Sequence, residues 1–295
     1  MDLVSIIILN WNRCEELEKT INLIQNQTYQ NVEIIVVDNA STDGSLDMLK
    51  KNFKNIKLIC LSSNLGCEEG FNVGIVNSSG NYILFLDNDA SIENEGIEKA
   101  LVEFKNNKKL GVLDIRVFNT FNNKIINEPK VWPIKNNFTA CVVFIKSEVF
   151  KKIGLRPSEY FIYTSEADIS LRVIDAGYEI AHTTNIVGHH RESPKKRLSS
   201  NFFYYYTRNS IWLIWKHYPI LPALQETLFL IIINFVRSII NLSFYSFIKG
   251  LFEGFLLIYK NAIKKRKVLS KWHEARLLPP PTLLYKIIIK KVLRK

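Results

Sequence analysis

The chain has 295 residues, of which 47% are hydrophobic and 23% charged, so the composition excludes a disordered protein and predicts one large or two modest folded domains. The net charge of +11 lies at one end, because residues 260–295 hold twelve Lys or Arg and one acid, Glu274, while residues 1–259 balance. Such an end is typical of segments that bind an anionic membrane surface or a nucleic acid, and a solubilising tail is the alternative.

The cysteines and the start of the chain bear on location. The four cysteines form no CxxC pair and no dense framework, so we expect free thiols in a reducing compartment. The first predicted strand, residues 3–9, begins almost at Met1, so we expect no signal peptide before it. Both observations predict a cytoplasmic protein.

Apolar strands and amphipathic helices alternate in the first part of the chain. Strands are predicted at residues 3–9, 32–37, 57–61 and 82–86, with a helix in each interval. This order predicts a parallel sheet covered by helices on both faces. Glycines at positions 66, 70 and 74 allow close approach of a helix to the sheet. Their spacing fits neither a dinucleotide fingerprint nor a phosphate loop, so a dinucleotide enzyme and an ATPase are not supported.

The strand at 82–86 runs into Asp87-Asn88-Asp89. Residues i and i+2 at a strand end point to the same side, so Asp87 and Asp89 can aim two carboxylates beyond the carboxyl edge of the sheet, where open α/β sheets bind ligands. Two such oxygen donors suit Mg²⁺ or Mn²⁺ shared with a diphosphate. An Asn/Asp turn is the structural alternative. Asp38 ends the second strand and can accept hydrogen bonds from a base or a ribose, or cap a helix.

Further candidates follow in the second half. Glu166 and Asp168 open a predicted helix, where acids in the first turn after an N-cap at Thr164 or Ser165 are the structural alternative. His189 and His190 follow a short strand, and a histidine there is a candidate third metal ligand, since imidazole and carboxylate together accept Mn²⁺. A buried structural pair of histidines is the alternative.

Four segments, in this order and spacing, resemble one known family. They are SIIILNWN at 5–12, VVDNASTDGS at 36–45, the glycine-spaced stretch at 64–74 and LFLDND at 84–89. The chain thereby resembles the family 2 glycosyltransferases of the GT-A fold, particularly bacterial enzymes similar to rhamnosyltransferases. The resemblance implies a Rossmann-like α/β domain with a mostly parallel sheet, and a nucleoside-diphosphate sugar, UDP- or dTDP-linked, as donor.

The resemblance also implies roles for single residues. Asp38 would read the base, while Asp87 and Asp89 would handle ribose, diphosphate and the metal, Mg²⁺ or Mn²⁺. Family members carry two adjacent acids where this chain has Ser165-Glu166, and the second acid is the general base, which maps to Glu166. Ser165 departs from the pattern and leaves open which contacts hold Glu166. The other residues expected to bind the nucleotide-sugar are Asn10, Asn39, Asn64, Gly66, Asn88 and Arg191.

A histidine occurs in similar proteins near position 189, so we favour His189 over His190 as the third metal ligand. The basic residues after it, Arg191 first, are candidates for neutralising a leaving diphosphate.

Residues 201–295 differ from the rest. Aromatic side chains are dense at 202–218, and the apolar stretches 228–236 and 238–248 are interrupted by Arg237 and Lys249. Because no run of 18 apolar residues remains, we predict helices lying in a membrane interface rather than a spanning helix. A hydrophobic hairpin packed on the catalytic domain or on a second subunit is the alternative, which leaves a homo-oligomer open. The predicted domains are a catalytic domain, 1–200, and this helical region, 201–295.

The sequence therefore predicts an inverting glycosyltransferase that acts on a glycan or lipid-linked glycan acceptor in surface polysaccharide synthesis. We expect it at the inner face of the cell membrane, bound to the anionic surface, with no nucleic acid partner. A sugar nucleotidyltransferase would normally need a glycine-rich, basic loop after the first strand, which residues 10–13 do not form. A non-catalytic membrane-binding relative would leave Asp87, Asp89 and Glu166 without a role.

Overall fold

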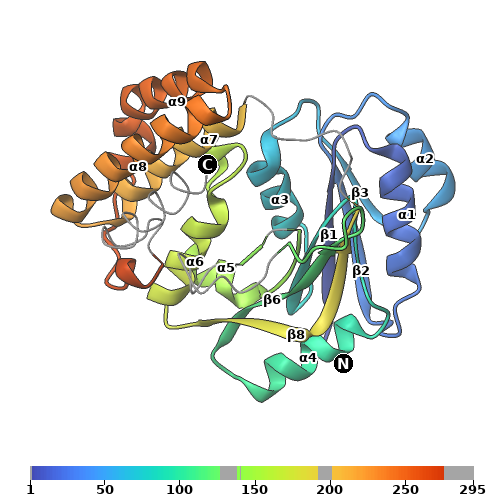
Figure 1. Cartoon of the computed structure of the whole chain (residues 1–295). Coiled ribbons are helices and arrows are strands. Elements are labelled where there is room, and N and C mark those ends of the chain that lie inside the picture. The colour runs from blue at the N-terminus through green and yellow to red at the C-terminus, as the bar shows by residue number, and fades with distance from the viewer. Residues whose placement is uncertain (1, 127–137, 140, 192–200, 276–295) are drawn as a thin grey trace. The chain divides into compact units, whose positions relative to one another are not determined.

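A computed structural model describes residues 2–126, 138–139, 141–191 and 201–275 (Figure 1). The chain divides into two compact units, one of residues 1–128 and 137–199 and the other of residues 129–136 and 200–295. The limits of functional domains, 1–200 and 201–295, stay a proposal.

The first unit is built on an eight-stranded mixed sheet with the order β3-β2-β1-β4-β7-β6-β8-β5. Its strands are β1 (Val4–Asn10), β2 (Val32–Asp38), β3 (Lys57–Cys60), β4 (Tyr82–Asp87), β5 (Ala90–Ile92), β6 (Leu110–Asn119), β7 (Val142–Lys146) and β8 (Glu179–His190). The first four strands are parallel, as the alternation of strands and helices predicts. Strand β7 is antiparallel to β4 and β6, β6 is parallel to β8, and β5 is antiparallel to β8.

Helices cover both faces of this sheet, which confirms the predicted fold class. One face carries α1 (Cys14–Gln25), α2 (Ser45–Asn52) and α4 (Gly96–Asn106), and the other carries α3 (Gly66–Val76), α5 (Ser147–Ile153) and α6 (Ser165–Asp175). Strand β1 is covered on both faces because its side chains point alternately to one face and the other. Ile6 and Ile8 pack with α1, while Ile7 packs with Phe71 of α3. A strand buried on both faces reads as a continuous apolar run.

The second unit is helical in its described part. It contains α7 (Asn201–His217), α8 (Ile220–Ile240) and α9 (Phe244–Leu256), followed by short helical turns at Tyr259–Ile263 and Trp272–Ala275. Helix α8 is one unbroken 21-residue helix with a mean hydropathy of 1.6 over its most apolar window, and by length and composition it could cross a membrane. Arg237 interrupts the apolar sequence but lies inside α8, which continues to Ile240.

Candidate active site

The strand ends of the first unit bring the predicted polar residues to one edge of the sheet. Asn10 pairs in register with Asp38 of β2, and Leu9 pairs with Asp87 of β4. Asp38 is fully buried and accepts hydrogen bonds from Asn10 Nδ2 at 3.0 Å and from the Ser41 backbone N–H at 2.8 Å. Helix α2 begins seven positions later, with Gly44 as its N-cap, so Asp38 does not cap it.

Two asparagine pairs extend this polar edge. Asn88 Nδ2 donates to Asn10 Oδ1 at 2.8 Å, so the ends of β2, β1 and β4 are joined through Asp38, Asn10 and Asn88. Asn39 donates to Asn64 Oδ1 at 3.0 Å and to the Gly66 carbonyl at 3.1 Å, which ties the end of β2 to the start of α3. The Asn39 backbone N–H also donates to the Asn10 carbonyl at 2.8 Å, so these two sets of contacts are joined.

Gly66 holds a backbone conformation that a side chain would not tolerate. Its φ is +87°, and a Cβ atom there would lie 2.5 Å from Cδ2 of Phe161. The Cys67 backbone N–H donates to the Phe161 carbonyl at 2.6 Å, so the start of α3 is fixed against the segment that precedes α6. Gly66 therefore connects the polar strand edge with the part of the chain that carries Glu166.

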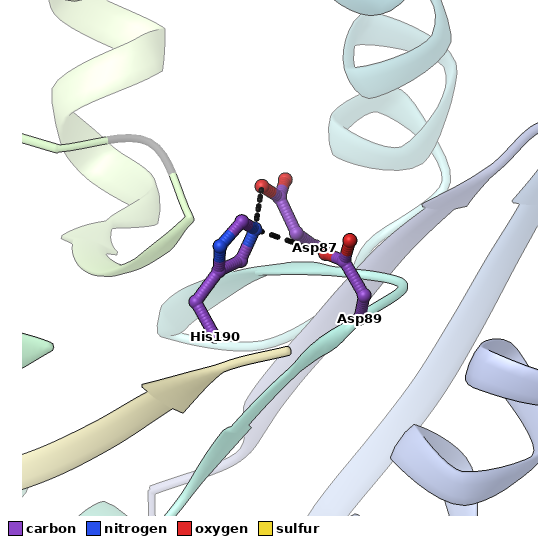
Figure 2. A group of neighbouring side chains, drawn as sticks. All are labelled: Asp87, Asp89 and His190. Atoms are coloured by element: carbon purple, nitrogen blue, oxygen red, sulfur yellow. Dashed lines mark ion pairs between the residues drawn. The ribbon is translucent and has the colours of Figure 1, made fainter. Parts of the chain in front are cut away.

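Asp87 and Asp89 meet a histidine beyond the end of β4 (Figure 2). His190 Nε2 lies 3.0 Å from Asp89 Oδ1 and 3.6 Å from Asp87 Oδ2, and the candidate ligand atoms lie within 4.8 Å of one another. The Asp89 side chain is 1% exposed and that of Asp87 is 35% exposed. The two carboxylates therefore lie close together, as their spacing at the end of a strand predicts.

The histidine beside the acids is His190, which corrects the preference for His189. Consecutive residues of a strand point to opposite sides, and near the end of β8 His189 is exposed and stacks on Phe118 with ring centroids 6.2 Å apart. Pairing of His190 with Ala90 of β5, and a hydrogen bond from the Arg191 N–H to the Asp89 carbonyl at 2.7 Å, bring the end of β8 to the acids.

The donor set fits a divalent cation. Two carboxylates and one imidazole suit Mn²⁺, and the carboxylates also suit Mg²⁺. Burial lowers the pKa of His190, but the ion pairs with Asp87 and Asp89 outweigh it and raise the pKa to about 10. At neutral pH the imidazolium thus supplies one positive charge beside two carboxylates, and a divalent cation bound in place of its proton would supply two. Arg13 also pairs with Asp89, its Nη1 lying 2.6 Å from Oδ2, a contact that sequence reasoning missed.

Arg191 lies beside helix α1. Its Nε is 2.7 Å from Glu16 Oε2, and its Nη2 also hydrogen-bonds to the hydroxyl of Thr20. The guanidinium is thus held by α1, and its expected part in neutralising a diphosphate stays a prediction.

Glu166 stands in the first turn of α6, with a side chain 21% exposed. It accepts a hydrogen bond from Ser165 Oγ at 3.2 Å, and its Oε1 lies 3.7 Å from Nη2 of Arg156. Ser165 and Arg156 are therefore the residues that hold Glu166 in this chain. Asp168, in contrast, is buried against Arg172 at 2.6 Å and Tyr160 at 3.1 Å. It therefore has a structural position.

The neighbour that sequence reasoning missed is the buried Arg156. Its Nε lies 2.8 Å from Glu68 Oε2, and both side chains are 1% exposed. From the sequence alone, a charged residue between Gly154 and Pro157 is expected in a surface loop. Glu68 is expected to be an acid that stabilises the first turn of a helix. No local pattern in the sequence signals that they meet.

Comparisons with known proteins agree with this architecture. Residues 5–156 match the family model described as Glycosyl transferase family 2. Glycosyltransferase AglE of Haloferax volcanii is 26% identical over 211 residues, which cover 65% of this chain and 67% of AglE. The Escherichia coli enzyme named UDP-Glc:alpha-D-GlcNAc-diphosphoundecaprenol beta-1,3-glucosyltransferase WfaP is 38% identical over 91 residues, which cover 30% of this chain and 36% of WfaP.

A solved structure gives the same fold. The mannosyltransferase PcManGT from Pyrobaculum calidifontis, in complex with GDP-Man and Mn²⁺, superposes with a TM-score of 0.58 at 16% identity and covers 86% of this chain and 75% of its own. At that identity the likeness shows the fold alone, which is GT-A. With more than half of its residues matched by the family model, the chain belongs to glycosyltransferase family 2.

Proposed function

We propose that this glycosyltransferase moves a sugar, with inversion at the anomeric carbon, from a nucleoside-diphosphate sugar to a hydroxyl of a glycan acceptor. The observation that carries the proposal is the convergence of Asp87, Asp89 and His190 at the carboxyl edge of the sheet, with the partly exposed carboxylate of Glu166 in the same unit.

In this proposal each of the site residues has a separate role. Asp38, held by Asn10 and Ser41, accepts hydrogen bonds from the nucleotide base. Glu166 accepts the proton of the acceptor hydroxyl as its oxygen attacks the anomeric carbon, so no covalent enzyme intermediate is needed. Mg²⁺ or Mn²⁺ held by Asp87, Asp89 and His190 would stabilise the negative charge that develops on the departing diphosphate.

The donor is a UDP- or dTDP-linked sugar in this proposal. The relative WfaP is named for UDP-Glc, and PcManGT was solved with a nucleotide-sugar and Mn²⁺. Both support a nucleotide-sugar for this chain, and hexosyl or rhamnosyl transfer is the reaction we expect.

The acceptor is a lipid-linked glycan of surface polysaccharide synthesis, reached from the cytoplasmic face of the membrane. Helices α8 and α9 support this, because their exposed apolar side chains exceed what scattered surface residues explain. These include Leu228, Ile232, Phe235, Val236, Ile239, Ile240, Phe252, Phe255 and Leu256. The cations that follow, Lys260 and residues 264–267, suit an anionic lipid surface. WfaP, whose name states a diphosphoundecaprenol acceptor, points the same way.

Release of free nucleotide from a panel of UDP-, dTDP- and GDP-sugars tests the function directly. We expect release from at least one donor, loss of release in excess chelator and recovery with added Mn²⁺. Asp89→Ala should lower turnover by orders of magnitude in a folded protein, whereas Asp47→Ala, an exposed acid of α2, should not. Full turnover in chelator would remove the metal from the proposal, and a wild-type protein that releases no nucleotide from any donor would remove the function.

A further inference from the structure

Arg156 is a buried cation directly behind the candidate base, and the proposed reaction assigns it no role. Its side chain is 1% exposed and touches two acids from different parts of the chain. Nε lies 2.8 Å from Glu68 Oε2, and Nη2 lies 3.1 Å from Ser165 Oγ and 3.7 Å from Glu166 Oε1. One guanidinium therefore links α3 to the first turn of α6.

Helix α3 and strand β4 together hold Arg156 in place. The Arg156 backbone N–H donates to Asn72 Oδ1 at 2.9 Å, and Asn72 Nδ2 donates back to the Arg156 carbonyl at 3.0 Å. The guanidinium carbon lies over the rings of Phe71 at 5.0 Å and Phe85 at 5.4 Å. Contacts thus hold the backbone, the guanidinium carbon and the nitrogen atoms of Arg156. The guanidinium therefore has little conformational freedom, and its position relative to Glu166 is well defined.

Packing alone does not require a charge at this position. Burial raises the pKa of Glu68 to about 7 even though the charge of Arg156 opposes this shift. The desolvation of the carboxylate thus outweighs its attraction to the arginine. Buried ion pairs can often be exchanged for apolar residues of similar volume without loss of stability. A buried charged pair at this position therefore calls for a role that an apolar pair would not supply.

We propose that Arg156, anchored by Glu68, is a positioning residue that sets the place and orientation of the Glu166 carboxylate through its Nη2 contacts with Glu166 and Ser165. The inference rests on the proposed function, in which Glu166 is the general base. Arg156 itself touches no reacting atom. Ser165 completes the arrangement, since its hydroxyl accepts from Arg156 and donates to Glu166 Oε1 at 3.2 Å.

The planar fork of arginine is essential to this arrangement. Its Nε points to Glu68 while Nη2 serves Ser165 and Glu166, so two directions are satisfied at once by a rigid group. Lysine has a single ammonium group, which could not reach both Glu68 and the two α6 residues Ser165 and Glu166. Arg156→Lys should therefore lower turnover although the charge is kept.

The decisive variant replaces the buried pair by an apolar pair, Glu68→Leu with Arg156→Met. It removes both charges of the buried pair together, and Glu166, whose side chain is 21% exposed, keeps its contact with Ser165 and with solvent. Folding can therefore be preserved, and thermal unfolding checks this. The readout is nucleotide release by hydrolysis from whichever sugar nucleotide the wild-type protein uses fastest, with the donor dissociation constant measured by calorimetry. We expect turnover to fall roughly 10- to 100-fold, as for a displacement of a reacting group by about 1 Å, while donor affinity changes by less than about threefold.

The same double change in a Glu166→Gln background separates positioning from a general structural role. If Arg156 acts through Glu166, the double change lowers the residual turnover no further. If it lowers the turnover of Glu166→Gln by the same factor as that of the wild type, or if the folded apolar double variant keeps wild-type turnover, the inference is wrong. Failure of the proposed function looks different, because the wild-type protein itself would then release no nucleotide.

Discussion

At the scale of single residues, the first prediction concerns the base. Glu166→Gln keeps the shape of the side chain and an oxygen that can accept from Ser165, but it cannot take a proton. We expect glycosyl transfer to fall roughly 10²- to 10⁴-fold, the usual cost of a lost general base, with unchanged donor binding. Nucleotide release and titration calorimetry measure the two effects. Asp168→Asn is the contrasting variant, since it disturbs the contacts with Arg172 and Tyr160 and should act on stability. Normal transfer by Glu166→Gln would move the base elsewhere.

Glu68 leads to a prediction about pH. Its pKa is raised to about 7, mainly by burial, so the folded state binds this proton more tightly than the unfolded chain does. The stabilising contribution of the protonated carboxyl is fully present below the unfolded pKa of about 4.3 and is lost as the pH rises through 7. The unfolding free energy of the wild type should therefore fall between pH 5 and pH 8 relative to that of Glu68→Gln.

Urea unfolding of both proteins across this pH range measures the difference. Glu98→Gln, which changes an exposed acid of α4, should show no such trend against the wild type. A difference between wild type and Glu68→Gln that stays constant with pH would show that Glu68 is ionised throughout.

At the scale of elements, helix α3 depends on glycine where it crosses β1. A Cβ atom at Gly70 would lie 2.4 Å from Leu9 Cδ1, and one at Gly74 would lie 2.4 Å from Ile7 Cγ2. Alanine normally favours a helix over glycine by about 1 kcal/mol, but here the close approach to the sheet should reverse the sign. We expect Gly74→Ala to lower the unfolding free energy by about 1–3 kcal/mol through overpacking.

Denaturant unfolding of Gly74→Ala beside Val76→Ala tests this expectation. Val76 is 69% exposed near the end of the same helix, so its truncation should change stability little. Equal or higher stability of Gly74→Ala would mean that α3 can move away from β1 without cost.

The elements that the sequence predicts best are those whose signal is local. Strands β1 to β4 lie within one residue of their expected limits, because continuous apolar runs ending in polar residues mark buried parallel strands. The convergence of Asp87 and Asp89 follows from their spacing at the end of β4.

The elements that escape prediction depend on distant partners. The pairing of β6 with β8 changes register between residues 115 and 116, so β8 contains an irregularity before its last residues. The side to which His189 and His190 point depends on that irregularity, which no local pattern reports. The meeting of Arg156 with Glu68 likewise joins residues far apart in sequence.

At the scale of the whole molecule, we predict that the full chain binds anionic vesicles. Exposed aromatic and aliphatic side chains of α8 and α9 should insert, while each nearby cation contributes on the order of 1 kcal/mol at an anionic surface. Salt should weaken binding, because exposed charges are screened beyond about 8 Å at physiological ionic strength, but should not abolish it.

Co-sedimentation with phosphatidylglycerol vesicles at low and high salt measures both contributions. The double variant Phe252→Asp, Leu256→Asp changes side chains 65% and 63% exposed and should lose the salt-resistant part, whereas Phe121→Asp, 71% exposed in the first unit, should not. A full chain that stays in solution beside these vesicles at low salt would favour a subunit interface on α8 and α9.

The position of the metal-ligand candidates along the chain has a consequence for how the molecule assembles. Asp87 ends β4 and Asp89 lies two residues later, whereas His190 ends β8 about one hundred residues further along the chain. The three side chains can meet only after β8 has paired with β6 and β5, a late event for contacts so distant in sequence. A cation bound by both the end of β4 and the end of β8 would then slow unfolding and leave the folding rate almost unchanged. The ion that we propose for the reaction would thereby also lengthen the lifetime of the native state.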